Sequence, residues 1–473
     1  MANGSVHSDS GSDLAALLEE ELESISLPGS PRDRLEVDSV EEPRQTKRQS
    51  ALPVEEKRSL KRPKSGILTN GGSESLCPPH PGFMYGMCIR CGHQADEAEA
   101  DRDAVALRYI HSGLKLSASE AERVRQQSLK RVISNKKLLL VLDLDHTLLN
   151  STRFDEAVGF EEQLAAIQQA RSEDQPESLY HLEHMHLWTK LRPYVREFLE
   201  KAHEVSEMHI YTHGNAEYAA EMAKLLDPTK RFFAERIISQ GDSTVKHVKD
   251  LDVVLGADEA VVILDDTAGV WPSHQRNLLQ VERYVFFPAC ARRFELDTSS
   301  LLEQGRDEDE QGGMLASALR VLQQVHERFF AAGAAGSEQD VREHLQALRG
   351  GVLSGCRICF SRIIPQGDPM PEAHHLWQLA QQLGAVVTLG VDEDTTHVVA
   401  AAKNTDKVHW AAAHNRHIVS PAWLHACACL WRRMDEGQFP VGAASAFGTK
   451  GAMSAEEDTK AALAGAGGGV ATS

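Results

Sequence analysis

The sequence predicts an α/β protein with a parallel sheet at its centre, and three observations carry that prediction. Leu138–Leu142 are five consecutive apolar residues that run into charge, which is typical of a strand buried on both faces. Further along, segments with strand character alternate with helical segments, which indicates βαβ units. After an Ala/Gly-rich linker the alternation starts again, which predicts a second, smaller α/β domain.

The order of elements follows from apolar periodicity and from capping residues. A charged helix is expected over residues 117–135, with Ser117 and Ser119 as candidate N-caps. The larger domain is expected to contain strand 138–142, helix 194–204, strand 208–212, helix 216–226, strand 261–264, strand 284–287 and helix 314–330. The smaller domain is expected to contain strand 356–360, helix 374–383, strand 385–388, strand 396–400, helix 405–414, strand 417–419 and helix 421–431. An acidic, Gln-rich insertion at 153–187 is expected to cap a site at the sheet edge.

Shifts in composition divide the chain into six regions. Its ends are polar, acidic or Gly/Ala-rich, which predicts disorder there. The regions are a disordered N-terminal arm (1–76), a Cys/His-rich segment with a lead-in helix (77–136), the larger domain (137–330), a linker (331–350), the smaller domain (351–441) and a disordered tail (442–473).

Charge and hydropathy limit the classes of function. The 473 residues carry a formal net charge of -19, which argues against direct nucleic-acid binding because that usually requires a basic surface. The start of the chain lacks a signal-peptide layout, and no apolar run approaches about 18 residues, so we expect a soluble intracellular protein without membrane binding. Eight cysteines in this length fit a reducing compartment.

Two basic groups lie in the N-terminal arm, Lys47-Arg48 and the stretch from Lys57 to Lys64. Their spacing resembles a bipartite nuclear-import signal, which predicts a nuclear protein. A solvated basic patch in a disordered arm is the alternative interpretation.

The first strand of the larger domain runs directly into Asp143, Asp145 and Thr147. Ligands of open α/β sheets bind at the carboxyl ends of the strands. Two residues apart on a nearly extended chain, the two carboxylates share one face and converge on one reaction centre. This layout is typical of enzymes that form an aspartyl-phosphate, in which one carboxylate attacks phosphorus and the other moves protons.

Phosphoryl transfer also requires a hydrogen-bond donor and a cation for the phosphoryl oxygens, and carboxylates that bind a metal; three later features match these requirements. The strand 208–212 ends on Thr212, whose hydroxyl suits a hydrogen bond to a phosphoryl oxygen, and Lys249 supplies a cation. The strand 261–264 ends on Asp265 and Asp266, which brings carboxylates to the same sheet edge. A hard divalent cation with oxygen ligands fits such a cluster, and Mg²⁺ is the natural choice.

This ordered set resembles the haloacid dehalogenase superfamily, and longer motifs extend the likeness over roughly residues 137–330. The motifs are Lys190-Leu-Arg192-Pro193, Tyr211-Thr-His-Gly-Asn215, Met222-Ala-Lys-Leu-Leu-Asp-Pro228, Arg236-Ile-Ile-Ser239 and Asp265-Asp-Thr-Ala-Gly-Val-Trp271. They resemble the phosphatase domain of the RNA polymerase II C-terminal-domain phosphatases, above all the plant-type subgroup. The resemblance implies a Rossmann-like parallel sheet with a cap insertion.

The resemblance also implies roles for single residues. Asp143 would attack the phosphorus of phosphoserine or phosphothreonine, and Asp145 would protonate the leaving oxygen and then activate water. Mg²⁺, for which Mn²⁺ or Co²⁺ could substitute, would be held by the Asp143 side chain, the Asp145 backbone carbonyl and Asp266. Thr212 and Lys249 would orient the phosphoryl oxygens.

Further roles follow from the same resemblance. Thr147 would brace the nucleophile loop, and Arg192 would lie near the phosphate. Asp265 would either order the water shell of the metal or hold Lys249. Thr267 stands where some family members carry an arginine, and this departure removes the substrate contact that such an arginine would make.

A cluster of soft ligands precedes the larger domain. Cys77-x-x-His80 and Cys88-x-x-Cys91 form two close pairs, which is the pattern of a structural zinc knuckle. His93 and His111 are alternative fourth ligands. A flexible segment with coincidental thiols is the competing interpretation.

The region 351–441 resembles a BRCT domain. The residues that carry this resemblance are Thr396-His-Val-Val-Ala400, Trp410 and Pro421-Ala-Trp423-Leu. Phosphopeptide-binding BRCT domains use a hydroxyl after the first strand and a lysine at the second helix, and Ser361, Thr405 and Lys407 match those positions. Arg362 replaces the glycine usual in those members, which hinders close backbone approach to an anion. General docking onto polymerase or transcription factors is the alternative use.

The resemblances together predict a nuclear, Mg²⁺-dependent protein serine/threonine phosphatase that acts on the phosphorylated heptad repeats of RNA polymerase II. A tethered BRCT domain would raise the effective substrate concentration. The alternative from another class is a catalytically inactive BRCT adaptor that binds phosphorylated nuclear proteins, and the complete set of acidic and basic site residues argues against it. A small-molecule phosphatase is disfavoured by the import signal and the BRCT domain.

Overall fold

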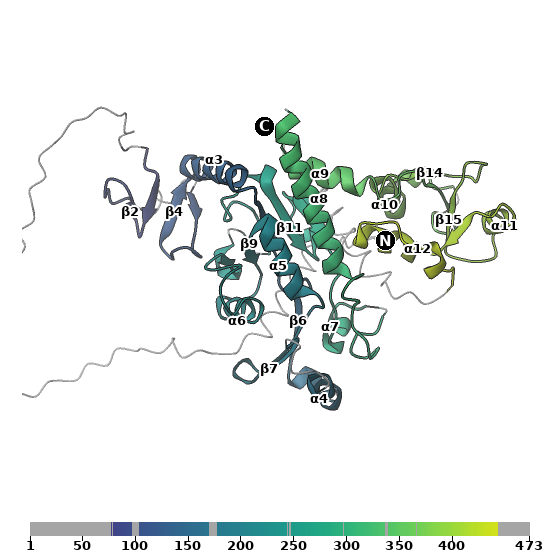
Figure 1. Ribbon diagram of the computed structural model, residues 1–473, viewed down its shortest axis with the longest axis horizontal. Helices are drawn as coiled ribbons and strands as arrows, with labels where there is room; N and C mark the ends of the chain where they lie inside the picture. Colours follow the sequence, from purple (N-terminus) through teal and green to yellow (C-terminus); the bar gives the residue numbers. More distant parts are fainter. Residues whose placement is uncertain are drawn as a thin grey trace, which may run out of the picture.

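The computed structural model describes residues 77, 79–96, 104–169, 177–243, 245, 247–296, 298–335, 339–365 and 367–442. The predicted import signal and most of both terminal regions lie outside the described residues. Figure 1 shows three groups of strands along the molecule: a small N-terminal sheet, a central sheet flanked by helices, and a C-terminal domain. In the described part of the chain, no helix combines the length and apolar character needed to span a membrane.

A five-stranded parallel sheet forms the centre of the larger domain. Its strands, in spatial order, are β10 (Ile237–Ile238), β9 (Ser206–Tyr211), β5 (Leu138–Leu142), β11 (Val261–Asp265) and β12 (Leu278–Gln280). Every pairing is parallel. All five side chains of β5 are buried, as the continuous apolar run predicted. Leu142 pairs with Ile210 on one side and with Leu264 on the other, so the three central strands end at a common edge.

Helices cover this sheet and share its core. They are α3 (Ala118–Asn135), α5 (Val195–Val205), α6 (Ala216–Leu226), α8 (Met314–Ala335) and α9 (Val341–Arg349). Helices α5 and α8 pack side by side (Figure 1). Ser117 caps α3 by accepting a hydrogen bond from the backbone N–H of Glu120 at 3.3 Å, as predicted. The parallel α/β fold expected from the sequence is therefore confirmed.

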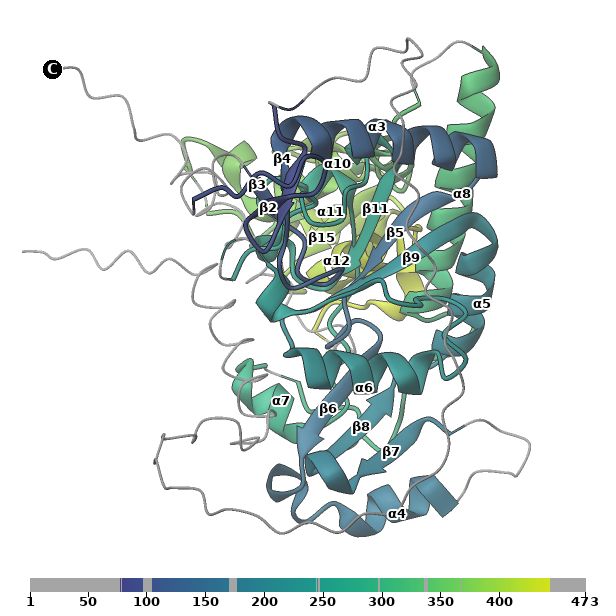
Figure 2. The ribbon, with the colours of Figure 1, turned by 90° about the vertical axis from the view of Figure 1, so that its left-hand side faces the viewer.

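The insertion after β5 forms a second, smaller sheet. It contains β6 (Leu149–Arg153), α4 (Glu161–Gln169), β7 (Leu179–Leu182) and β8 (Leu187–Leu191). The strands pair antiparallel in the order β6-β8-β7. Figure 2 shows this small sheet beyond one end of the central sheet, beside α6. The cap insertion expected from the sequence therefore exists, with strands that begin at Leu149.

The strand predicted over 284–287 is wrong. These residues are buried, but they have no partner strand in the described chain. The Asn150 side chain accepts hydrogen bonds from the N–H groups of Phe286 and Phe287, at 2.9 and 3.0 Å, and Tyr284 donates its N–H to the His146 carbonyl. The carbonyls of Val285 and Phe286 accept hydrogen bonds from the N–H groups of Leu301 and Leu302, which belong to no strand. A side chain and an irregular segment thus satisfy the backbone groups that a strand ladder would otherwise satisfy. The outer strand of the sheet is β12 instead.

The N-terminal segment folds into a four-stranded antiparallel sheet that the sequence analysis did not predict. The strands are β1 (Gly82–Met84), β2 (Met87–Cys88), β3 (Ala104–Ala106) and β4 (Leu114–Ser117), in the order β2-β1-β4-β3. They are very short, which explains why no periodicity was visible.

The C-terminal domain is a parallel sheet in the order β14-β13-β15-β16 with three helices. The elements are β13 (Arg357–Ser361), α10 (His375–Gln382), β14 (Val386–Thr388), β15 (His397–Ala400), α11 (Asp406–Ala413), β16 (His417–Val419) and α12 (Pro421–Leu430). Each predicted element is present within one or two residues. Trp423 is fully buried in its core, as expected.

The region predicted as a linker contains structure that joins the two α/β domains. Helix α8 continues to Ala335, and α9 buries Val341 and Leu345 in the core of the larger domain. Helix α12 contacts α8, and its last residue, Leu430, belongs to that same core. The two domains therefore share apolar packing rather than being connected by an extended tether.

Candidate active site

The carboxyl end of β5 places two carboxylates at the edge of the central sheet. The Asp143 N–H donates to the carbonyl of Leu264 in β11 at 3.0 Å, so the sheet pairing continues one residue past the strand. Asp143 and Asp145 are both buried. The chain then turns sharply at His146, whose φ is +62°.

Lys249 lies between two of the carboxylates. Its Nζ is 2.6 Å from Asp143 Oδ1 and 2.7 Å from Asp265 Oδ2. Burial alone lowers the pKa of Lys249, but the two carboxylates outweigh burial and raise it above its usual value. The Trp271 indole N–H also donates to Asp265 Oδ2, at 2.9 Å. Asp265 thus holds Lys249, one of the two roles that the resemblance left open.

The site carries more negative than positive charge. Burial raises the pKa of Asp143 well above its usual value; the charge on Lys249 opposes this, while the nearby carboxylates of Asp265 and Asp266 add to it. The pKa of Asp265 is raised, again with burial as the largest cause. A buried excess of carboxylates favours binding of a cation.

The Asp266 carboxylate has three side-chain partners: Arg283, Thr147 and Thr267, whose hydroxyl donates to Oδ2 at 3.1 Å. Its Oδ2 lies 2.6 Å from Arg283 Nε, and its Oδ1 accepts from the Thr147 hydroxyl at 3.5 Å. Thr147 also accepts a hydrogen bond from the Asp266 N–H at 3.1 Å. Burial raises the pKa of Asp266, but Arg283 and His146 hold it below its usual value. Asp266 is therefore ionised at neutral pH.

The carboxylates of Asp143, Asp265 and Asp266 fit a divalent metal. Oxygen atoms from all three lie within 4.8 Å of one another, and all three residues are buried. Hard cations such as Mg²⁺ prefer this all-oxygen donor set. The structure therefore brings the two predicted side-chain ligands, Asp143 and Asp266, into one group together with Asp265. Asp145, whose carbonyl is the third predicted ligand, follows directly on the same loop.

A second His/Glu group does not fit a metal equally well. His397, His417 and Glu436 lie together in the C-terminal domain. There the Arg433 guanidinium donates to Glu436 at 2.7 Å, so the carboxylate already has a cationic partner. The one carboxylate of this group is balanced by that guanidinium, so the group has no excess negative charge, whereas the carboxylates at the edge of the central sheet outnumber Lys249 and Arg283.

Asp145 is oriented by a residue that the sequence analysis missed. The Tyr218 hydroxyl, from α6, donates to Asp145 Oδ1. The same hydroxyl is 2.9 Å from the Ser151 hydroxyl, which is 2.9 Å from that of Thr189. This buried hydroxyl chain connects Asp145 to the cap sheet. Tyr218 carried no sequence signal of its own, because an aromatic residue on an amphipathic helix usually indicates core.

Thr212 follows β9 and is buried at the same sheet edge. Its hydroxyl oxygen accepts a hydrogen bond from the Gly214 N–H at 2.9 Å. A Cβ atom at Gly214 would lie 2.6 Å from the Tyr218 ring, so only glycine allows the tyrosine to approach this loop. Thr212 thus lies on the predicted edge, beside the helix that supplies Tyr218.

Arg192 is buried and its guanidinium is engaged by protein groups, which offers little support for the predicted phosphate contact. Its fully buried guanidinium pairs with Glu308 at 2.7 Å and donates to the carbonyls of Thr147 and Glu282, at 3.0 and 2.8 Å. Arg192 therefore braces the loop that follows Asp145 from the inside. The guanidinium beside Asp266 and Thr267 comes from Arg283, which the sequence analysis did not identify.

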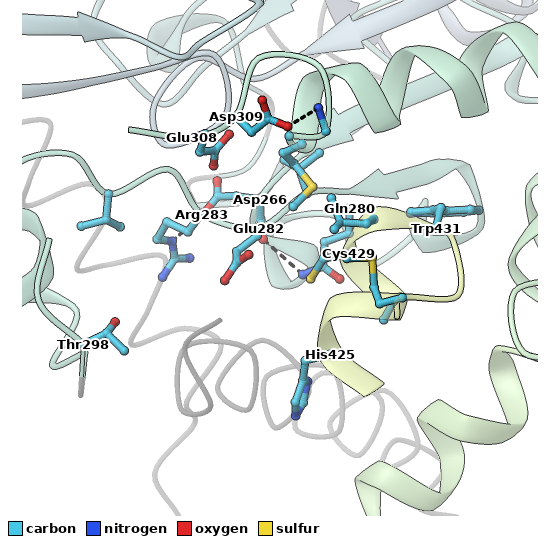
Figure 3. Close-up of a pocket in the computed structure, with 18 of the residues that line it drawn as sticks. Asp266, Gln280, Glu282, Arg283, Thr298, Glu308, Asp309, His425, Cys429 and Trp431 are labelled. Carbon is cyan, nitrogen blue, oxygen red and sulfur yellow. Dashed lines mark hydrogen bonds and ion pairs between the residues drawn. The ribbon is translucent and has the colours of Figure 1, made fainter. Parts of the chain in front are cut away.

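A cleft of about 530 Å³ opens between the two α/β domains (Figure 3). Asp266 and Arg283 line it from the larger domain. His425, Trp431 and Arg432 line it from the C-terminal domain. Of the residues in the carboxylate cluster, Asp266 lines this cleft, and Asp143, Asp145 and Asp265 do not. The cleft therefore touches one side of the cluster, and both domains contribute to it.

The remaining predicted residues form two separate groups. Cys77, His80, Cys88 and Cys91 are brought together at the N-terminal sheet.

In the C-terminal domain, the Ser361 and Thr405 hydroxyls are 2.7 Å apart, so this predicted docking pair is adjacent. Lys407 instead donates to the backbone carbonyls of Phe360 and Leu389, at 2.8 and 2.7 Å. Arg362 adopts φ +59°, the conformation expected where related domains have glycine.

Two family models match the chain. The model for NLI interacting factor-like phosphatase matches residues 138–309. The model for the BRCA1 C Terminus (BRCT) domain matches residues 349–428.

The chain is also similar to named proteins. RNA polymerase II C-terminal domain phosphatase-like 4 of Arabidopsis thaliana is 40% identical over 441 residues, which cover 92% of this chain and 95% of that protein. RNA polymerase II C-terminal domain phosphatase-like 3 of the same plant is 45% identical over 334 residues, which cover 68% of this chain but only 27% of that longer protein. The solved structure of Fcp1, an essential RNA polymerase II CTD phosphatase, aligns at 26% identity and a TM-score of 0.49 over 67% of this chain and all of that chain.

Proposed function

Because this chain belongs to the RNA polymerase II C-terminal domain phosphatase family, we propose that it is a Mg²⁺-dependent enzyme acting on the phosphorylated heptad repeats of the polymerase tail. The observation that carries the proposal is the buried group in which Lys249 bridges Asp143 and Asp265 beside Asp266. Lysine and aspartate side chains in a surface cluster are normally solvated, whereas here the lysine is buried between two carboxylates.

Asp143 is the nucleophile in this proposal. Its carboxylate oxygen forms a bond to the phosphorus of phosphoserine or phosphothreonine while the bond from phosphorus to the side-chain oxygen breaks. Lys249 fixes Oδ1 of Asp143 and balances negative charge as the phosphoryl group approaches. Asp265 and Trp271 keep Lys249 in this position.

Asp145 moves the proton in both half-reactions. In the first it gives a proton to the departing serine or threonine oxygen, and in the second it takes one from a water molecule. That water attacks phosphorus, the bond from phosphorus to Asp143 breaks, and inorganic phosphate leaves. Tyr218 fixes one oxygen of Asp145, which sets the plane of the carboxyl group for both transfers.

The carboxylates of Asp143 and Asp266, with the Asp145 carbonyl, would hold Mg²⁺. When bound, the ion supplies positive charge that lets an anionic nucleophile approach an anionic phosphate. The resemblance and the all-oxygen donor set support Mg²⁺, for which Mn²⁺ or Co²⁺ would substitute.

The interdomain cleft is the proposed path for the polymerase tail. Arg283 and Arg432 line it from opposite domains and are the cations there that would attract a phosphorylated peptide. Arg283 also pairs with Asp266, and the acidic Glu282, Glu308 and Asp309 line the same cleft. The BRCT domain would raise the local concentration of the repeats or bind associated transcription factors. Its Ser361 and Thr405 hydroxyls are the proposed docking residues, whereas the contacts of Lys407 with carbonyls offer less support for a phosphate contact.

A nuclear location is part of the proposal, and the basic groups at Lys47-Arg48 and 57–64 support it. Fusion of the full chain to a fluorescent protein tests this. We expect nuclear fluorescence, and replacement of both basic groups by alanine should shift it to the cytoplasm. Unchanged nuclear fluorescence after that replacement would reject the import role of these residues.

Hydrolysis by the purified full chain tests the enzymatic proposal. Release of phosphate from p-nitrophenyl phosphate and from phosphoserine heptad peptides is measured with Mg²⁺ and with excess chelator, beside Asp143→Asn. The exposed Asp394 supplies a matched Asp394→Asn control that should keep wild-type hydrolysis of the small ester. Activity that requires Mg²⁺ and Asp143 supports the proposal. Absence of hydrolysis under every condition would favour the inactive adaptor.

A further inference from the structure

Four soft ligand atoms meet at one point of the N-terminal sheet. The Sγ atoms of Cys77 and Cys88 are 3.9 Å apart, and Cys91 Sγ is 3.5 Å from His80 Nδ1. Ligand atoms from all four residues lie within 4.8 Å of one another. The four residues form two close pairs in the sequence, and the β1–β2 hairpin folds the second pair back onto the first.

These separations match those of a tetrahedral metal site. With Zn–S bonds of about 2.3 Å and Zn–N bonds of about 2.05 Å, tetrahedral geometry places two sulfurs about 3.8 Å apart and a sulfur and nitrogen about 3.6 Å apart. The observed values of 3.9 and 3.5 Å lie close to both. A disulfide requires about 2.05 Å between sulfurs, so Cys77 and Cys88 are not bonded to each other.

The turn from Cys88 to Gly92 directs a backbone N–H group at the sulfur of Cys88. The Arg90 N–H points to Cys88 Sγ at 3.4 Å, and the Gly92 N–H closes the turn on the Cys88 carbonyl at 3.0 Å. Gly92 has φ +75°, a conformation that favours glycine. A backbone N–H directed at a thiol sulfur stabilises the thiolate, which is the form that binds a metal.

The apolar cluster beneath the β1–β2 hairpin is too small to hold the hairpin in one conformation by itself. Only Phe83 and Cys88 are buried in its cluster, with Cys77 and Ala95 packed against them. Tyr85, Met87 and Ile89 are instead among the exposed large side chains. Small units with so little buried surface usually require a disulfide or a metal to offset the entropy of ordering.

We propose that Cys77, His80, Cys88 and Cys91 bind one structural Zn²⁺ ion that fixes the β1–β2 hairpin to the segment before it. The proposal does not depend on the proposed function, since this group lies apart from the carboxylate cluster. The geometry selects His80 over the two alternative histidines. His93 stacks on the His80 ring, with 4.9 Å between centroids, and His111 packs against Tyr85.

The zinc site would also stabilise the interface between the N-terminal sheet and the larger domain. Through β1, the hairpin pairs with β4, whose Leu116 packs with Leu255 of the larger domain. Arg108 reaches the Gly241 carbonyl at 3.2 Å. Loss of the metal should therefore loosen the N-terminal sheet while the central sheet remains folded.

The test measures zinc in the full chain, purified with Zn²⁺ present and then dialysed. Elemental analysis should find about one zinc per chain in the wild type. Cys91→Ser should lower this to nearly zero, whereas His93→Asn is the matched control and should keep it. Because Cys91 is exposed, the serine leaves no cavity, and circular dichroism checks that the chain is folded. Asp143→Asn should retain zinc, which separates this site from the carboxylates.

Two further readouts address the ligands and the structural effect. Replacement of zinc by Co²⁺ should give the visible absorption of a tetrahedral thiolate site in the wild type and lose it in Cys91→Ser. Limited proteolysis should cut the N-terminal sheet faster in Cys91→Ser than in His93→Asn. The proposal is overturned by a wild-type chain without zinc, by zinc retained in both Cys88→Ser and Cys91→Ser, or by a Cys77–Cys88 disulfide found by mass spectrometry.

Discussion

Replacement of Tyr218 by phenylalanine removes one hydroxyl from the site and leaves the buried ring in place. That hydroxyl donates to Asp145 Oδ1 and contacts the Ser151 hydroxyl at 2.9 Å. The ring is 1% exposed, so phenylalanine preserves the packing of α6 against the sheet. The substitution therefore changes the orientation of the proton-transferring carboxyl group without opening a cavity.

The expected loss follows from the kind of hydrogen bond that is removed. A hydrogen bond to a charged group contributes about 1.5–3 kcal/mol. Since about 1.4 kcal/mol corresponds to a tenfold change in rate, kcat should fall roughly 10- to 150-fold. Ser151→Ala is the matched control: it removes only neutral hydroxyl contacts, worth about 0.5–1.5 kcal/mol, so its kcat should fall about tenfold or less.

Steady-state hydrolysis of p-nitrophenyl phosphate by the two variants and the wild type measures both effects. KM should stay near the wild-type value, because Tyr218 acts through Asp145 and not through the substrate. Thermal melts establish that each variant is folded at the assay temperature. A folded Tyr218→Phe enzyme with wild-type kcat would refute the assigned role of this hydrogen bond.

Three further predictions follow from the same contacts. Lys249→Met should lower kcat about 100- to 1000-fold in the ester assay, since Asp143 loses its cationic partner; a loss below tenfold would contradict the role of Lys249. Arg192→Ala leaves the carbonyls of Thr147 and Glu282 without their donor and the partly exposed Glu308 without its cationic partner; it should destabilise the fold by about 1–3 kcal/mol in urea melts, and unchanged stability would contradict the bracing role. Burial lowers the pKa of His397 to about 4, so its contribution to stability is complete above about pH 6.5 and is lost as pH falls towards 4, by up to about 3 kcal/mol. His397→Gln should flatten that pH dependence in melts, and an unchanged slope would show that other groups cause it.

The sequence predicted the parts of the site that lie on regular elements. Strands β5 and β11 are continuous apolar runs that end abruptly in carboxylates, so both their burial and the position of Asp143, Asp265 and Asp266 at one sheet edge could be read from local pattern. Thr212 followed from the same rule for β9.

Residues that act through long-range contacts were missed or misplaced for a physical reason. Tyr218 lies on the inner face of an amphipathic helix, where local pattern indicates core. Arg283 comes from an irregular segment after β12, and Arg192 finds its partner Glu308 more than a hundred residues away. Residues 284–287 were wrongly predicted as a strand because their backbone bonds to the Asn150 side chain and to the irregular segment at Leu301 and Leu302, and no local pattern reveals such partners.

We propose that Asp143 forms a covalent phosphoenzyme, and trapping this species shows whether it exists. The full chain with Mg²⁺ is mixed with radiolabelled phosphopeptide, quenched in acid within milliseconds, and digested for mass spectrometry. We expect hydroxylamine-sensitive label on the peptide that contains Asp143, and neither label nor turnover in Asp143→Asn. Label on a different residue, or wild-type turnover by Asp143→Asn, would contradict this proposal.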